Sequence, residues 1–367
     1  MKAPGVRVVI SLACVVVIVA GLKVAGALLV PIVLGLFLAF VSLPLTRALQ
    51  RYRVPSVMAV ALTVVIDMLI VGSIIFITIS LIPDFQKEVP GYVSRLQAVG
   101  LEWMASLEER AHLEGAVEAY RNLFDMSGVI ELVRQTEAIQ RLTSLISKSF
   151  VVMILMIFIL TEAGSFKVKI QEIFAADGPN LARFQHSTQE IQKYLGIKTM
   201  ICLVTGLLAG LLTWAFGLKF FIVWGLVAFV FNYIPVIGSI LAAIPAVFVA
   251  LVQPEVGGPL PALGVAIGYL LINLILGNFV EPLLLGRRFG LSTIVVLLSV
   301  LFWGWLWGPV GMFLSVPLTM MLKVMLDNTE DFRWISVAMG KTRPGSMESL
   351  AEREARALEE DDQIVGA

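Results

Sequence analysis

Long apolar runs separated by shorter polar stretches recur along most of this 367-residue chain. A transmembrane helix needs about 20 predominantly apolar residues. Six runs reach or approach that length: Val6–Leu22, Ala27–Leu45, Val57–Ile82, Leu145–Leu160, Thr199–Phe216 and Pro261–Val280. The pattern therefore predicts an all-α, polytopic membrane protein.

Two more apolar segments, residues 220–252 and 292–326, are each interrupted by a short break that contains proline and glycine. In lipid, a broken helix frees backbone N–H and C=O groups that only protein or trapped water can satisfy. Paired interruptions of this kind point to a transport site, although prolines also produce purely structural kinks in membrane helices. We expect two broken or re-entrant helical hairpins. The break residues expected to shape or line a solute path are Asn232, Pro235, Gly238, Pro309 and Gly311.

Polar stretches divide the chain into regions. Residues 83–144 are charged, with apolar positions recurring at steps of three and four, which is typical of amphipathic helices. The chain ends in a polar stretch that contains Glu359-Glu360-Asp361-Asp362. We expect three transmembrane helices in residues 1–82, an extracytoplasmic helical excursion in residues 83–144, a transmembrane helix and a cytoplasmic connector helix in residues 145–198, a transport core in residues 199–326, and a cytoplasmic acidic tail in residues 327–367.

Lysine and arginine set the expected orientation, because cytoplasmic loops carry an excess of both. Lys2 and Arg7 place the N-terminus in the cytoplasm. If segment 220–252 dips into the membrane and returns, Arg287, Arg288 and the C-terminal tail are cytoplasmic. If the segment crosses fully, this arginine pair lies outside. Each half of the segment is roughly 18 Å long at about 1.5 Å per residue, against a hydrocarbon core of about 30 Å, which favours the return.

Asparagine side chains lie in the first break and between the two breaks. Each offers two donors and an acceptor carbonyl, and an unpaired amide in hydrocarbon is costly. Asn273 and Asn278, together with Asn232, are therefore expected to face protein or water and to bind a small polar, hydroxyl-rich solute. Hydrogen bonding between helices is the structural alternative for Asn273 and Asn278. Asn232 is expected both to satisfy the backbone groups freed at the break and to contact the solute.

Four charged residues are the other candidates. Glu281, Arg287 and Arg288 follow the last uninterrupted run and are expected to form a cytoplasmic gate or latch. Asp67 falls in the middle of the third run. An ionisable residue at that depth is a functional candidate by default, here for ion coupling.

Composition excludes several other classes of protein. The chain is 58% hydrophobic and 15% charged, with no net charge, so nothing in it suggests a nucleic-acid partner. Cys14 and Cys202 are far apart, and His112 and His186 lack the spacing of metal ligands. Nucleotide-binding, metalloprotease and serine-hydrolase motifs are absent from the sequence. We therefore expect no enzyme activity, no cofactor and no metal site.

Several motifs of the C-terminal half resemble the autoinducer-2 exporter family, and its quorum-signal exporter branch in particular. The motifs are Asn232-Tyr233-Ile234-Pro235, Ile237-Gly238-Ser239, Gly277-Asn278, Glu281-Pro282, Gly308-Pro309-Val310-Gly311 and Ser315-Val316-Pro317-Leu318-Thr319. The resemblance spans most of the chain and is most specific from Lys198 to Leu326.

That resemblance implies a bacterial inner-membrane secondary transporter that moves the small polar quorum signal autoinducer-2. It also implies a homo-oligomer, with five subunits as the expected number. Some relatives are instead associated with exchange of sodium or lithium against protons, a function that would need an intramembrane carboxylate such as Asp67. A non-transporting scaffold or sensor, using residues 83–144 to bind a partner, is the remaining alternative.

Overall fold

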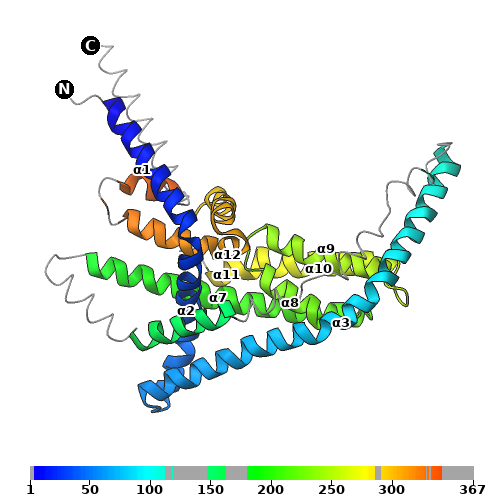
Figure 1. Cartoon of the computed structure of the whole chain (residues 1–367), viewed down its shortest axis with the longest axis horizontal. Coiled ribbons are helices and arrows are strands. Elements are labelled where there is room, and N and C mark those ends of the chain that lie inside the picture. The colour runs from blue at the N-terminus through cyan, green and yellow to red at the C-terminus, as the bar shows by residue number, and fades with distance from the viewer. Residues whose placement is uncertain are drawn as a thin grey trace, which may run out of the picture.

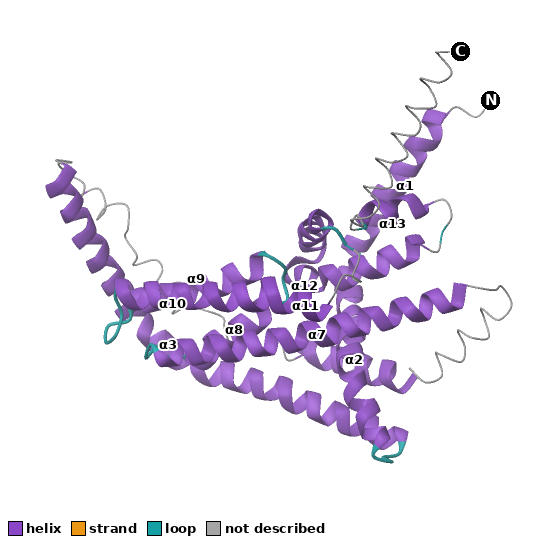
Figure 2. Ribbon diagram, turned by 180° about the vertical axis from the view of Figure 1, so that it is seen from behind, coloured by secondary structure: helices purple, strands orange, loops and turns teal. Residues whose placement is uncertain are grey.

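The computed structural model describes residues 4–111, 118, 147–162, 180–285, 291–327, 329 and 332–340. Within these ranges every regular element is a helix, as Figures 1 and 2 show. The helices up to the first break are α1 (Pro4–Val24), α2 (Gly26–Arg51), α3 (Ser56–Ala111), α7 (Asn180–Ala215) and α8 (Phe221–Phe231). They are followed by α9 (Ile237–Val252), α10 (Pro259–Asn273), the π-helix η1 (Leu274–Val280), α11 (Glu281–Leu285), α12 (Thr293–Asp327) and α13 (Arg333–Met339). Residues 147–162 are also helical.

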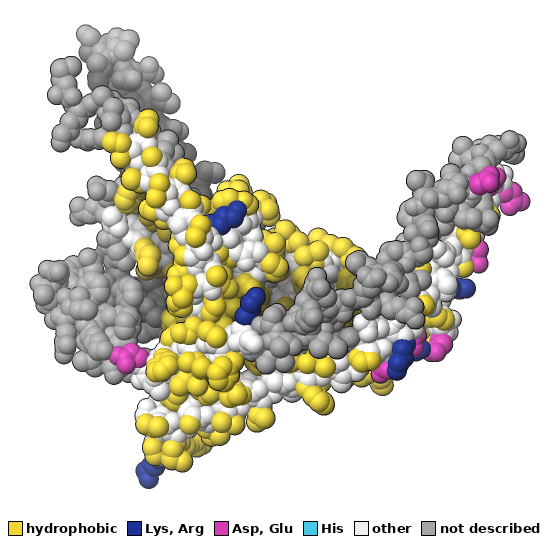
Figure 3. All heavy atoms as spheres, viewed as in Figure 1, with side chains coloured by type: hydrophobic (Ala, Val, Ile, Leu, Met, Phe, Trp, Pro, Cys, Tyr) yellow, Lys and Arg dark blue, Asp and Glu magenta, His cyan; other side chains and the backbone are white. Residues whose placement is uncertain are grey.

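Length and hydropathy identify five helical segments in the described ranges that can cross a membrane. They are Gly26–Arg51, Ser56–Leu81, Gln189–Ala215, Pro259–Leu285 and Thr293–Asp327. Shorter apolar helices occupy Ala13–Val24, Phe221–Phe231 and Ile237–Val252. Hydrophobic side chains cover most of the described surface seen in Figure 3, whereas charged side chains gather along the far part of α3. The prediction of an all-α, polytopic membrane protein is confirmed.

The third predicted span and the start of the predicted excursion form one helix. α3 continues without interruption through Pro83 and Pro90 to Ala111, so the boundary expected after Ile82 is not a helix end. A proline removes only one main-chain hydrogen bond, and the apolar spacing of three and four beyond it sustains the same helix. The excursion beyond α3, apart from residue 118, lies outside the described residues.

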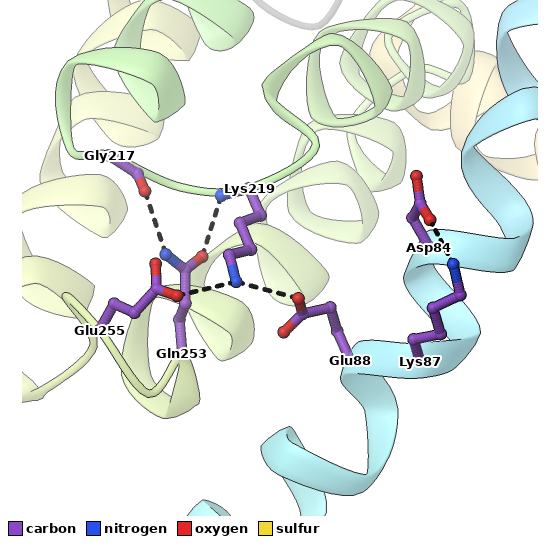
Figure 4. Close-up of polar contacts among 7 residues, drawn as sticks. All are labelled: Asp84, Lys87, Glu88, Gly217, Lys219, Gln253 and Glu255. Carbon is purple, nitrogen blue, oxygen red and sulfur yellow. Dashed lines mark hydrogen bonds and ion pairs between the residues drawn. The ribbon is translucent and has the colours of Figure 1, made fainter.

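The first interrupted segment is a helical hairpin, which we call the first hairpin: α8, a break at residues 232–236, and α9. The Gln253 side chain joins its two ends, because it accepts a hydrogen bond from the Lys219 N–H (2.9 Å) and donates one to the Gly217 carbonyl (3.0 Å). Figure 4 shows this clasp. A straight helix would separate Lys219 and Gln253, which are 34 residues apart, by about 50 Å. The hairpin therefore starts and ends at the same place.

Replacing Gln253 by leucine is expected to lower the free energy of unfolding by about 1–3 kcal/mol, because it leaves the Gly217 carbonyl and the Lys219 N–H without partners. Gln253 is only 1% exposed, so water cannot replace the lost amide. Gln50→Leu is the matched control, because the amide of Gln50 bonds Ser56 in an exposed position and its loss should change stability by less than about 0.5 kcal/mol. Unfolding in mixed detergent micelles measures both, and equal effects would contradict the clasp.

α7 and α10 run in opposite directions and pack against each other as well as against the first hairpin. α7 ends and α10 begins at the hairpin ends, where the Gly258 N–H bonds the Ala250 carbonyl (3.1 Å). Farther along both helices, Lys198 of α7 reaches Glu281 at the start of α11 (2.8 Å). The two ends of the first hairpin therefore lie together, beside the end of α7 and the start of α10.

The second interruption lies inside α12, at Trp307 and Gly308, whose backbone angles are not helical. The indole N–H of Trp303 donates to the Thr319 hydroxyl at 3.0 Å, although 16 helical residues would separate them by about 24 Å. The two halves of α12 therefore meet at a sharp bend, with Trp303 packed against the second half, and we call them the second hairpin. Both predicted breaks are present.

Candidate functional site

The two hairpins meet at an aromatic cluster in the packed core. The ring of Tyr233, in the first break, lies 4.4 Å from that of Phe313, in the returning half of α12. Phe37 of α2 packs edge-on against both rings, at 5.9 and 5.1 Å between centroids. The two breaks and α2 therefore form one junction.

Glycine makes both turns possible by the same contact. A Cβ on Gly238 would overlap the carbonyl oxygen of Phe231, and a Cβ on Gly311 would overlap that of Trp303. In each hairpin, the first turn of the returning helix thus lies directly against the backbone of the outgoing one. Gly308 adds a backbone conformation (φ 66°, ψ −147°) that is essentially restricted to glycine. Pro309, beside it, is exposed.

Val236 carries strain in the first break. Its angles (φ 64°, ψ −54°) and the hydrogen bond from the Ile237 N–H to the Pro235 carbonyl (2.7 Å) define a classic γ-turn. Positive φ is rare for a β-branched residue, and such strain persists at sites that the surrounding structure holds in place. Sequence reasoning selected Pro235 here but not Val236, because valine carries no turn signal.

A polar stripe on α7, formed by Thr199, Cys202 and Thr205, contacts the first break. The Asn232 amide donates to the Thr205 hydroxyl (3.3 Å) and to the Cys202 sulfur (3.5 Å). The Tyr233 hydroxyl donates to Thr199 at 2.8 Å. The Asn232 amide therefore bonds side chains of α7 rather than the backbone freed at the break. Its carbonyl oxygen can still accept a hydrogen bond within the described part of the chain.

Lys198 and Glu281 form a buried ion pair below this stripe. The lysine ammonium contacts both carboxylate oxygens, at 2.9 and 2.8 Å, and the side chains are only 5% and 20% exposed. Burying two charges is expensive unless they stay paired. Sequence reasoning placed Lys198 at the end of a cytoplasmic connector, whereas it lies inside the span Gln189–Ala215. Arg287 and Arg288, the other expected gate residues, lie outside the described residues.

Asn273 and Asn278 belong to an irregular stretch of helix. Asn273 ends α10, and Asn278 lies in the π-helix η1, which leads directly to Glu281. π-Helical turns are rare and frequent at functional sites. Asn273 is half-buried and Asn278 is exposed, and among the described residues no hydrogen bond joins either side chain to Asn232. The structure thus brings Asn232, but not these two, into bonded contact with α7.

Asp67 lies in a separate polar seam between α2 and α3. The Thr46 hydroxyl donates to that of Thr63 at 3.0 Å, and both threonines are buried. One turn farther along α3, Asp67 faces Ser42 of α2. One of its carboxylate oxygens is buried and has no hydrogen-bond partner in the described part of the chain.

At the hairpin ends, Lys219 bonds Glu88 of α3 (2.9 Å) and Glu255 (3.0 Å). The hydrogen bonds that its ammonium donates, to Glu88 first and Glu255 second, raise the pKa of Lys219 above its usual value. A raised lysine pKa contributes stability that is complete below the unfolded-state pKa of about 10.4 and is lost as pH rises through the folded-state pKa.

Lys219→Met is therefore expected to lower the thermal unfolding temperature by the same amount at pH 6 and pH 9. The difference from wild type should shrink only in strongly alkaline solution, where the lysine of the wild-type protein loses its proton. Thermal unfolding followed by circular dichroism at a series of pH values measures this. A difference that already disappears near pH 8 would contradict the ion-pair arrangement.

Within the described ranges, no group of three or more His, Cys, Asp or Glu side chains is placed to hold a metal ion. The chemistry that the junction offers is hydrogen bonding from an amide, hydroxyls and a thiol, beside one ion pair. Broken helices that shelter such groups inside membrane-spanning segments are typical of secondary transporters.

Comparison with known proteins agrees with this class. The family model described as AI-2E family transporter matches residues 12–331. The chain therefore belongs to the AI-2E family transporters, a family of multi-pass membrane transport proteins.

Relatives are similar over nearly their whole length. The AI-2 transport protein TqsA of Escherichia coli (strain K12) is 36% identical over 335 residues, which cover 91% of this chain and 96% of TqsA. A putative transport protein of Haemophilus influenzae is 35% identical over 329 residues, 88% of this chain and 93% of that protein. The putative transport protein YhhT of Escherichia coli (strain K12) is 30% identical over 351 residues, 93% of this chain and 96% of YhhT.

Proposed function

We propose that this protein is a secondary transporter that exports autoinducer-2, or a closely similar small polar solute, across the bacterial inner membrane. The observation that carries the proposal is the 36% identity with a protein named for AI-2 transport, over 91% of the chain. The polar junction between two broken helices supports it, because a hydroxylated solute needs such groups at membrane depth.

In this proposal both hairpins are re-entrant. The clasp at Gln253 supports this, because both ends of the first hairpin lie where α7 ends and α10 begins. The N- and C-termini are then cytoplasmic, and the ion pairs of Lys219 with Glu88 and Glu255 lie on the outer side. Labelling a cysteine introduced at Arg287 with an impermeant reagent tests the orientation: it should react only when the cytoplasmic side is accessible. The transporter is a homo-oligomer in this proposal, with five subunits expected.

The solute path is assigned to the junction and the π-helix. Pro235, Gly238, Pro309 and Gly311 shape the turns, while Asn232, Asn273 and Asn278 supply hydrogen bonds to solute hydroxyls. Glu281 forms the gate or latch with Lys198, whose ion pair ties α7 to α11, and with Arg287 and Arg288. Opening the path then requires that this ion pair separate or move as a unit.

An export assay in inverted membrane vesicles tests the path. Asn273→Ala and Asn278→Leu are each expected to reduce autoinducer-2 flux at least about tenfold, the loss expected when a solute hydroxyl loses its hydrogen-bond partner. Asn180→Ala is the matched control, because Asn180 begins α7 outside the membrane-spanning part of that helix. Unchanged flux in both variants at normal protein levels would reject these residues as solute ligands.

A second candidate function, exchange of sodium or lithium against protons, is favoured by one observation. Asp67 has a buried carboxylate oxygen without a described partner, inside the span Ser56–Leu81. Under this alternative Asp67→Asn abolishes proton-coupled ion exchange in vesicles. If the protein instead exports autoinducer-2, the same substitution should leave that export nearly unchanged. Measuring both fluxes in the same variant separates the two functions.

A further inference from the structure

An open cleft of about 630 Å³ lies between α3 and the connection from α7 to α8. Its lining has two parts. One part is apolar and includes Leu81, Trp214 and Phe220; the other is charged and includes Asp84, Lys87 and Glu88. A pocket of this size accommodates a ligand larger than a water cluster, and its divided lining suits an amphipathic one.

The cleft lies at the ends of two membrane-spanning segments. The span Ser56–Leu81 ends at the cleft residue Leu81, and the span Gln189–Ala215 ends directly after Trp214. Tryptophan is enriched at the level of the lipid headgroups, where its ring is apolar and its N–H is wet. Trp214 is 62% exposed. The cleft therefore opens at the depth at which phospholipid headgroups lie.

The charges of the lining balance. Two amines, those of Lys87 and Lys219, stand beside two carboxylates, those of Asp84 and Glu88. Figure 4 shows that Asp84 and Lys87 form their own pair, apart from the contacts of Lys219 with both Glu88 and Glu255. The Lys87 side chain is 76% exposed, so its ammonium can reach a ligand. Such a lining complements one phosphate and one ammonium group together better than either sign alone.

We propose that this cleft binds a zwitterionic phospholipid with a primary ammonium headgroup, of the phosphatidylethanolamine type. Lys87 binds the phosphate, and the carboxylates of Asp84 and Glu88 accept hydrogen bonds from the ammonium. The acyl chains lie against the apolar side at Leu81 and Trp214. A quaternary ammonium has no N–H to donate, and an anionic headgroup leaves the carboxylates opposed by like charge. This site goes beyond the proposed solute path.

Native mass spectrometry of the delipidated full-length protein tests the lipid class. The protein is titrated with phosphatidylethanolamine, phosphatidylcholine and phosphatidylglycerol that carry identical acyl chains. The first lipid should bind about tenfold more tightly than the other two, the effect of one charge-assisted hydrogen bond. Equal binding of all three, or preference for phosphatidylglycerol, would overturn the proposal. Release of the bound lipid by ribose, a polyhydroxylated probe, would assign the cleft to solute instead and would also overturn it.

Variants locate the binding in the cleft. Lys87→Gln and Trp214→Leu should each weaken phosphatidylethanolamine binding about tenfold, and Asp84→Asn should shift the preference toward phosphatidylglycerol. Trp334→Leu is the matched control, because Trp334 is equally exposed (69%) but lies on α13, which does not line the cleft. Unfolding temperatures that equal that of wild type show that these surface variants fold. Wild-type lipid binding by all three folded cleft variants would refute the site.

Discussion

Replacing Lys198 by methionine is expected to lower the free energy of unfolding by about 3–5 kcal/mol, the effect of leaving one member of a buried ion pair without its partner. In this variant the Glu281 carboxylate loses both contacts of 2.9 and 2.8 Å. Because the carboxylate is only 20% exposed, water compensates for little of the loss. Unfolding in mixed detergent micelles, followed by circular dichroism, measures the change.

The controls for Lys198 separate burial from charge. Lys193→Met removes an exposed lysine from the same helix and should change stability by less than about 0.5 kcal/mol. The double variant Lys198→Met with Glu281→Gln should recover most of the loss, because neither side chain is then charged. Equal effects of Lys198→Met and Lys193→Met, or a double variant as unstable as the sum of the singles, would contradict the buried pair.

Gly238→Ala and Gly311→Ala are each expected to destabilise the protein by at least about 3 kcal/mol, the upper end of the usual effect of overpacking. The added Cβ would overlap a backbone carbonyl oxygen, of Phe231 in one case and Trp303 in the other. A backbone group cannot rotate away as a side chain can, so the returning helix must move. We expect both variants to lose the fixed turn and with it transport.

Two other glycines are matched controls for this prediction. A Cβ at Gly21 or Gly72 meets no atom within 4 Å, and alanine is a better helix former than glycine by about 1 kcal/mol. Gly21→Ala and Gly72→Ala should therefore be neutral or slightly stabilising. If Gly238→Ala and Gly311→Ala behaved like these controls, the close contact at the hairpin turns would be wrong.

Four of the predicted spans, those within α2, α3, α7 and the segment from α10 to α11, and the two breaks were predictable from sequence, because each has a strong local signal. Hydropathy identifies a span without knowledge of its neighbours, and proline with glycine marks an interruption in an apolar run. The Gln253 clasp has no such signal, because one glutamine after an apolar run looks like any polar loop residue. Its role depends on Gly217, 36 positions away.

Lys198 and the π-helix escaped sequence reasoning for different reasons. A lysine at the edge of an apolar run is normally a sign of the membrane surface, and only its partner Glu281, 83 residues later, reveals that it is buried. The π-helix at residues 274–280 arises from tertiary packing and has no periodicity of its own to detect. Asn273 and Asn278 were selected by residue type, which does not specify the face on which each side chain lies.

A cross-link between the two ends of the first hairpin tests most directly whether those ends lie together. Lys219→Cys and Glu255→Cys are combined in a chain with Cys14 and Cys202 replaced by serine, and a short bifunctional thiol reagent is added. The side chains of Lys219 and Glu255 are in contact at 3.0 Å, so we expect an efficient link within one chain. A mixture of the two single-cysteine proteins should give no link. Spin labels attached to the same two cysteines give their separation. A value near 54 Å, the length of an unbroken helix of 36 residues at about 1.5 Å per residue, would contradict the hairpin.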